Sequence, residues 1–185
     1  MTDTDIVARQ RADHARMDEL IERYEQGDVA AKCEVFRGLV TLVTTHAFAE
    51  ETVLFPAARK VLRERGEELT RTLEEEHQQV NELLAELDGH HAEDERVATS
   101  VPRLFAILRD DARREEDALL VDLAAAAPEQ LESLGRAWEA SRRVAPNRAH
   151  PAVPRRPPDD ALVAPFFTIV DRLRSMRARI LGRAQ

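Results

Sequence analysis

The chain repeats itself, and this repeat restricts the fold more than any other feature of the sequence. Residues 13–20 (DHARMDEL) resemble residues 76–83 (EHQQVNEL) at an offset of 63 positions, and residues 46–54 (HAFAEETVL) resemble residues 111–119 (DARREEDAL) at an offset of 65. Each half therefore has one segment with a single histidine and a second segment in which a polar residue precedes a glutamate by four positions. Two such halves, stacked as helical hairpins, would be related by approximate two-fold symmetry.

The repeated segments are predicted to be helical. Ala, Leu, Glu and Arg dominate the first 141 residues, and the whole chain has only six glycines, a composition with many helix formers and little turn chemistry. We expect helices over residues 5–26, 29–66, 67–87, 100–127 and 128–144. The predicted fold is all-α, a four-helix up-and-down bundle with additional C-terminal helices.

Glycine, proline and capping residues set the expected helix ends. Gly27 and Asp28 are predicted to end the first helix and cap the second. Pro56 predicts a kink or break in the second helix, which then resumes and ends at Gly66. Ser100 is predicted to cap the fourth helix, with the following proline in a position where the first turn tolerates it. Residues 90–95 are predicted to form a polar loop.

The C-terminal part of the chain differs from the rest in composition. Residues 146–158 contain five prolines, which excludes a helix interior and predicts an extended linker. Residues 159–185 then predict an amphipathic helix. Residues 1–141 have 17 basic and 32 acidic side chains, whereas residues 142–185 have 10 and 3. We therefore predict a bundle over 1–144 and a segment over 145–185 whose last helix packs on the acidic bundle.

Composition also excludes several classes of protein. The single cysteine, Cys33, cannot form an internal disulfide. The longest strongly apolar stretch, residues 119–127, is far shorter than the ~20 residues that span a bilayer. The N-terminal segment is acidic where a secretory signal would be basic and then apolar. An acidic main domain would repel a phosphate backbone. We expect a cytoplasmic protein, monomeric or homodimeric, that binds neither membrane nor nucleic acid.

Helical spacing directs six potential metal ligands into the bundle. Residues four apart share a helix face, so His46 with Glu50 and Asp111 with Glu115 each form a pair that points one way. Apolar residues on the same faces indicate that these pairs, together with His14 and His77 of the other two helices, face the interior. Leaving such groups buried and unpaired is costly, and a bound cation removes that cost.

The donor types indicate which metal could bind. Histidine and carboxylate without nearby cysteine suit a first-row metal of intermediate hardness, and the repeat predicts two ions. If Glu50 and Glu115 both bridge, the six predicted ligands still leave coordination positions for oxo, water or substrate oxygens.

These residues resemble the hemerythrin-like cation-binding, or HHE, family over about residues 5–125. The resemblance implies a four-helix bundle that holds an oxo- or hydroxo-bridged centre of two iron ions. Members of that family bind iron through His, His-x-x-x-Glu, His and His-x-x-x-Glu, and the matching residues are His14, His46, Glu50, His77 and Glu115. Asp111 departs from the pattern, which has histidine there. Residues 145–151 resemble the proline-rich C-terminal extensions of actinobacterial members.

Asp111 leaves alternatives open at the sixth position. It could bind the metal directly, or it could be a neighbouring acid beside Asp110 with water at the metal instead. His150 of the proline-rich segment could also fold back to that position. His90 and His91 are predicted to be exposed in the polar loop.

Four other residues near the predicted ligands have structural roles in our interpretation. Glu51 and Glu116 follow the two ligand glutamates by one position, so they point about 100° away and are expected to form salt bridges. Cys33 and Tyr24 are expected to be packing residues.

Position 111 also directs the functional hypothesis. An anionic oxygen ligand in place of neutral imidazole favours a ferric centre, which suits reaction with hydrogen peroxide better than reversible oxygen binding. The leading hypothesis is therefore a catalase-like reaction with hydrogen peroxide. The alternatives are a dioxygen carrier, store or sensor, and a protein of iron storage or of nitric oxide and iron-site repair.

Overall fold

The computed structural model describes residues 4–87 and 94–145, and within them it is helical and contains no strand. The elements are α1 (Ile6–Gln26), α2 (Val29–Ala49), η1 (Glu50–Leu54), α3 (Phe55–Leu62), α4 (Glu64–Leu87), α5 (Glu95–Arg114), η2 (Glu115–Leu119), α6 (Leu120–Ala126), η3 (Pro128–Gln130) and α7 (Leu131–Val144).

Two aspartates fix the starts of the first two helices. An oxygen of the Asp5 carboxylate accepts a hydrogen bond of 2.9 Å from the backbone N–H of Ala8, and Asp28 accepts one of 2.9 Å from Ala31. Each carboxylate thereby satisfies a backbone donor that has no partner inside its own helix. The predicted turn at residues 27 and 28 is confirmed.

The second and fourth long helices of the repeat each contain one π-helical turn, and both turns begin at a predicted ligand glutamate. α2 continues through η1 into α3, and α5 continues through η2 into α6. The N–H of Phe55 bonds to the carbonyl of Glu50, and the N–H of Leu120 bonds to that of Glu115. The predicted irregularity near Pro56 therefore starts before the proline, and its counterpart at η2 has no proline at all. The π turn belongs to the repeat, and such turns are frequent at functional sites.

The expected helix boundary at Gly66 was wrong. The helix before α4 ends at Leu62, and Arg63 follows it with a positive φ of 57°. Gly66 instead lies inside α4, where a Cβ atom would be 2.4 Å from the carbonyl oxygen of Ala58. Glycine is therefore needed at position 66 because α3 and α4 approach each other closely there, and not because a helix ends there.

The start of the fourth long helix was also misplaced. α5 begins at Glu95, so Ser100 lies within the helix and does not cap it. The extra residues bring Val97 into the hydrophobic core, where it is only 8% exposed. Burial of this side chain favours the earlier start.

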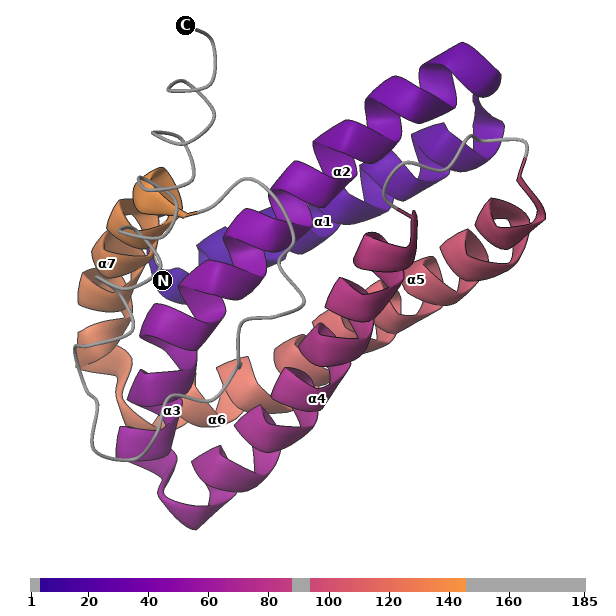
Figure 1. The fold of residues 1–185 in the computed structure, drawn as a ribbon. Helices are drawn as coiled ribbons and strands as arrows, with labels where there is room; N and C mark the ends of the chain where they lie inside the picture. Colours follow the sequence, from indigo (N-terminus) through magenta and orange to yellow (C-terminus); the bar gives the residue numbers. More distant parts are fainter. Residues whose placement is uncertain (1–3, 88–93, 146–185) are drawn as a thin grey trace, which may run out of the picture. The chain divides into compact units, whose positions relative to one another are not determined.

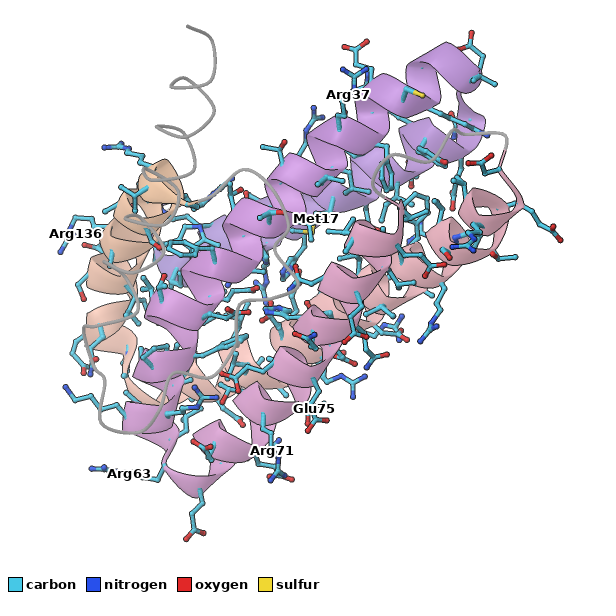
Figure 2. All side chains as sticks on the ribbon, in the orientation of Figure 1. Met17, Arg37, Arg63, Arg71, Glu75 and Arg136 are labelled. Carbon is cyan, nitrogen blue, oxygen red and sulfur yellow. The ribbon has the colours of Figure 1, made fainter. Side chains whose placement is uncertain are left out.

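The four long helices form the predicted bundle. Helix α1 packs against α2, and α4 packs against both α3 and α5, while α7 packs against α1, α2 and η1. Figure 1 shows α1 and α2 side by side, with α7 next to them at the end where α1 begins. Figure 2 shows Met17 between the helices, and it shows the labelled charged side chains pointing away from them: Arg37, Arg63, Arg71, Glu75 and Arg136. No helix of the described residues is long and apolar enough to span a membrane.

Two hydrophobic clusters fill the bundle, one toward each end of the helices. The first cluster contains Met17, Val43, Val80 and Leu108, among others. The second cluster contains Val7, Leu54, Leu73 and Leu119, among others. On each long helix, one member of the pair precedes and the other follows the predicted ligands. The ligands therefore form a polar layer between two apolar regions.

The structure tests the predictions for Tyr24 and Cys33 but not those for the C-terminal part of the chain. Tyr24 contacts Phe36 and Phe105, which confirms its packing role, whereas Cys33 is exposed, so its predicted packing role was wrong. His90, His91, His150, the proline-rich linker and the last helix lie outside the described residues. The division at residue 144 and the packing of the last helix stay predictions.

Candidate metal centre

Four predicted ligands meet at the centre of the bundle. One potential ligand atom from each of His14, His46, Glu50 and Glu115 lies within 4.8 Å of the others. All four side chains are buried, with exposed fractions of 5%, 3%, 0% and 0%. They come from α1, α2, η1 and η2, so both halves of the repeat contribute.

Glu50 links the two halves directly. Its Oε1 lies 2.9 Å from Nε2 of His46, and its Oε2 lies 3.2 Å from Nε2 of His77. On the other side of the cluster, Oε2 of Glu115 lies 3.2 Å from Nε2 of His14. All three histidines therefore present Nε2 to the same small region, as neutral histidines do when they bind metal.

Asp111 is the most remote of the six predicted ligands. Its carboxylate is buried, and Oδ2 lies 3.7 Å from Nε2 of His77. The structure thus brings all six residues to one site, with Asp111 and His77 on one side of Glu50 and His14 and His46 on the other.

Several polar atoms at this site are buried and form no well-directed hydrogen bond within the described residues, although Nε2 of His14, Nε2 of His46 and Oε2 of Glu50 each lie within 3.2 Å of another potential ligand atom. They are Nε2 of His14 and of His46, Oε2 of Glu50, Oδ1 of Asp111 and both carboxylate oxygens of Glu115. Orphaned polar atoms are rare in native interiors because each costs free energy. These atoms are all potential metal ligands, so the residues present fit a bound cation.

Without a metal, close contacts between histidines and carboxylates shift the pKa values of these buried side chains. Burial by itself lowers the pKa of His46, but the carboxylates of Glu50 and Asp13 outweigh it and raise that pKa to about 9. Burial likewise opposes ionisation of Glu50, yet His46 and His77 hold the pKa of Glu50 well below its usual range. Protons on histidine thus supply the positive charge that Glu50 needs.

Burial and neighbouring charges also shift the pKa values of Glu115, His77 and His14. Burial, Glu50 and Asp111 together raise the pKa of Glu115 far above that of an ordinary glutamate. Burial opposes protonation of His77, but Asp111 raises its pKa well above the usual range. Burial and the adjacent His46 lower the pKa of His14. A metal cation would replace these protons, because ligand atoms must be deprotonated to bind.

A second set of carboxylates holds the other ring nitrogen of each histidine. Nδ1 of His14 lies 2.8 Å from Glu116, and Nδ1 of His77 lies 3.0 Å from Glu51. The predicted ion-pairing role of Glu51 and Glu116 is confirmed, and their partners are two of the histidines predicted to bind metal. A carboxylate on Nδ1 orients the ring and leaves Nε2 free toward the metal.

Sequence reasoning also missed residues that contact the predicted ligands. Oδ2 of Asp13 lies 3.2 Å from Nδ1 of His46, and the side-chain amide of Gln10 donates a 3.1 Å hydrogen bond to Oε1 of Glu50. The ring of Trp138 meets His46 edge to face at 5.2 Å. The sequence did contain a signal for Asp13, because an acid precedes the histidine in both halves of the repeat, as Asp13-His14 and Glu76-His77.

A small cavity adjoins the cluster. Its volume is about 20 Å³, and the ligands His14, His46, Glu50, His77 and Asp111 line one part of it. The other walls are mainly apolar and include Met17, Val43, Val80 and Leu108. A space of this size holds about one water-sized molecule beside the ligands.

Comparison with known proteins agrees with this geometry. The family model of the hemerythrin HHE cation-binding domain matches residues 5–123. An uncharacterised hemerythrin-like protein of Schizosaccharomyces pombe is 26% identical over 133 residues, which are 71% of this chain and 65% of that protein. The chain thus spans a little less than two thirds of the relative's length. No solved structure matches. With the family match covering more than half of the chain, and its histidines and glutamates gathered in one buried cluster, the chain belongs to the hemerythrin HHE cation-binding family.

Proposed function

We propose that this chain holds two iron ions at the bundle centre and disproportionates hydrogen peroxide in the adjoining cavity. His14 and His46 lie on one side of Glu50, and His77 and Asp111 lie on the other. Glu50 presents one oxygen to each side, and Glu115 adds a second buried carboxylate. These six residues would hold two iron ions, with Glu50 and Glu115 shared between the two sides.

The observation that carries the peroxide assignment is the buried carboxylate of Asp111 at the cavity. An anionic oxygen donor favours the higher oxidation state of iron more than neutral imidazole does. Iron, when bound, supplies the redox chemistry by which two molecules of hydrogen peroxide become one of dioxygen and two of water. The protein's residues exclude bulk water from the cavity and limit its occupant to a small molecule.

A second candidate function is the binding of dioxygen, and one observation favours it. Met17, Val43, Val80 and Leu108 give the cavity apolar walls, which suit an uncharged diatomic molecule. In that case the chain would be a carrier, store or sensor, and exposure of the reduced protein to dioxygen would give a stable, reversible spectrum.

Metal analysis and spectroscopy test the proposed centre. We expect about two irons per chain, as the two sides of Glu50 imply, and an ultraviolet-visible band of a bridged ferric pair. Iron absent from the purified protein and not taken up by reconstitution would contradict the centre itself.

A matched pair of variants tests the peroxide reaction. Asp111→Asn removes the buried charge and should lower the rate at which peroxide yields dioxygen, measured with an oxygen electrode. Asp110→Asn, at the neighbouring exposed residue that pairs with Arg113, should leave the rate unchanged. Equal rates in both variants and the parent would contradict the role of Asp111, and no oxygen evolution from the iron-loaded parent would contradict the reaction.

We also propose that the protein works in the cytoplasm as a monomer or homodimer. The acidic composition of the bundle supports a protein that avoids nucleic acid. Sedimentation of the full chain measures the oligomeric state.

A further inference from the structure

We propose that α7, which lies beyond the residues matched by the family, positions His46 for metal binding through Arg142 and Trp138. This inference rests on the proposed metal centre and extends it to a helix that no family resemblance assigned.

Close contacts hold α7 against the start of α1 and against η1. A Cβ atom at Gly135 would lie 2.2 Å from the carbonyl oxygen of Thr4, so no larger residue allows this approach. The hydroxyl oxygens of Ser141 and Thr52 are 2.7 Å apart, and Arg9 of α1 pairs with Glu139 of α7. The C-terminal turn of α7 is thereby fixed next to the metal centre.

Arg142 reaches His46 through one carboxylate. Its Nη1 donates to both oxygens of Asp13 at 2.8 Å, and Oδ2 of Asp13 lies 3.2 Å from Nδ1 of His46. The Asp13 side chain is only 12% exposed and that of Arg142 is 26% exposed, so solvent screens the contact only partly. The guanidinium holds the carboxylate in the orientation that accepts from Nδ1, and Nε2 of His46 is then directed at Glu50.

Trp138 restricts the same imidazole from another direction. The indole is fully buried and meets the His46 ring at 5.2 Å, and the His14 ring meets His46 at 5.0 Å. Its Nε1 is buried and has no hydrogen-bond partner among the described residues. His46 therefore cannot rotate without displacing Trp138 or His14.

Carboxylates outside α7 hold the other two candidate ligand histidines. Glu116 holds Nδ1 of His14 and Glu51 holds Nδ1 of His77, and both carboxylates lie within the residues that the family matches. Arg142 should therefore affect the metal next to His46 more than the metal next to His77.

Iron release from the full-length protein tests the proposal. We load the protein with iron and measure its transfer to a competing chelator, together with the emission of Trp138, the single tryptophan of the chain. Arg142→Ala should release iron about tenfold faster, with a changed Trp138 emission, because loss of a group that orients a metal-binding histidine weakens metal affinity by ~10–100-fold. Arg143→Ala, which removes the same charge from the next, exposed position of α7, should behave as the parent does.

Two further variants separate positioning from packing. Arg142→Lys should restore slow release, because an ammonium group can take the place of the single nitrogen that contacts both oxygens of Asp13. Arg142→Gln keeps the aliphatic stem and should release iron quickly. It also keeps the test in place if Arg142→Ala does not fold, as judged by circular dichroism.

A double-mutant cycle with Asp13→Asn gives the decisive result. If Arg142 acts through Asp13, adding Arg142→Ala to Asp13→Asn should accelerate release no further. Additive effects, or release from Arg142→Ala at the parent's rate, would overturn the role of α7 while the metal centre stands. A parent chain that takes up no iron would instead overturn the centre, so the two failures are distinguishable.

Discussion

In the first half of the repeat an acid faces an imidazole, and in the second half the equivalent acid faces another carboxylate. Asp13 lies 3.2 Å from Nδ1 of His46. Its counterpart Glu76 lies beside Asp111, and burial together with Asp111 raises the pKa of Glu76 to about 6. Each acid also has an arginine, Arg142 at 2.8 Å from Asp13 and Arg114 at 2.8 Å from Glu76.

This difference explains what aspartate at position 111 does to the site. With histidine at 46, the acid and the ring attract each other and the ring is oriented. With aspartate at 111, two carboxylates share a partly buried space, and one of them must gain a proton or a cation. The second half therefore places two carboxylates together where the first half places a carboxylate and an imidazole.

The halves are nevertheless joined at the centre. Glu50 of the first half contacts His77 of the second, and Glu115 of the second contacts His14 of the first. The carboxylates on Nδ1 cross in the same way, because Glu51 holds His77 and Glu116 holds His14. Each half thus completes the site of the other.

Removal of Glu50 should have the largest effect, because both halves use its carboxylate. Glu50→Ala should lose nearly all iron and with it the thermal stability that the metal confers, since a ligand that binds only the folded state stabilises it. Elemental analysis and the melting temperature measure both. Glu75→Ala, at an exposed acid of α4, is the control, and full iron retention in Glu50→Ala would contradict a centre shared by the halves.

Asp111→His should make the halves alike and is the next largest change. Glu76 could then accept from an imidazole as Asp13 does, so iron should bind at least as well as in the parent. The reduction potential should rise, peroxide turnover should fall about tenfold or more, and any oxygenated form should last longer, because an anionic oxygen donor is lost. Oxygen evolution and stopped-flow spectra of the reduced protein check this. Unchanged turnover and spectra would show that position 111 does not act on the metal.

Glu51 and Glu116, the carboxylates on Nδ1 of His77 and His14, should contribute unequally to iron retention. The Glu51 side chain is 13% exposed and that of Glu116 is 32% exposed, so water can replace the second more easily. Glu51→Gln should therefore weaken iron retention by ~10-fold and Glu116→Gln by less. Chelator competition measures both rates, and a larger effect from Glu116→Gln would reverse our ranking of the two contacts.

The smallest effect concerns the pH dependence of the metal-free protein. His46 has a folded-state pKa of about 9 against an ordinary value of 6.5, so its stabilisation is complete below pH 6.5 and is lost as the pH rises through 9. Glu76 has a folded-state pKa of about 6 against 4.5, so its contribution is lost between those values as the pH rises. Melting temperatures should fall over both windows. His46→Gln should weaken the upper decline, to which His77 with its raised pKa also contributes, and Glu76→Gln should weaken the lower one. A parent curve that is flat from pH 4.5 to 9 would contradict both assignments.

The sequence by itself predicted the all-α bundle and the residues that meet in it. Local signals sufficed for this. A repeat of one histidine, then a His or Asp four positions before a glutamate, on apolar helix faces can bury its polar groups only by bringing them together. The same local reading failed at Gly66 and Ser100. Gly66 lies inside a helix because α4 packs closely against Ala58, and Ser100 lies inside a helix because α5 starts early enough to bury Val97. These tertiary contacts outweighed the usual preference of glycine and serine for helix ends.

Only the tertiary structure decided how the ligands are supported. Both π turns begin at the ligand glutamates, although only one is followed by a proline, and no local pattern distinguishes them from ordinary helix. Asp13 and Arg142 are 129 positions apart in the sequence, and yet their side chains are hydrogen-bonded. Trp138 is likewise distant from His46 in the sequence, although the two rings are in contact. Such contacts depend on where α7 packs, and that is set by shape and burial over the whole bundle, which periodicity along one helix does not encode.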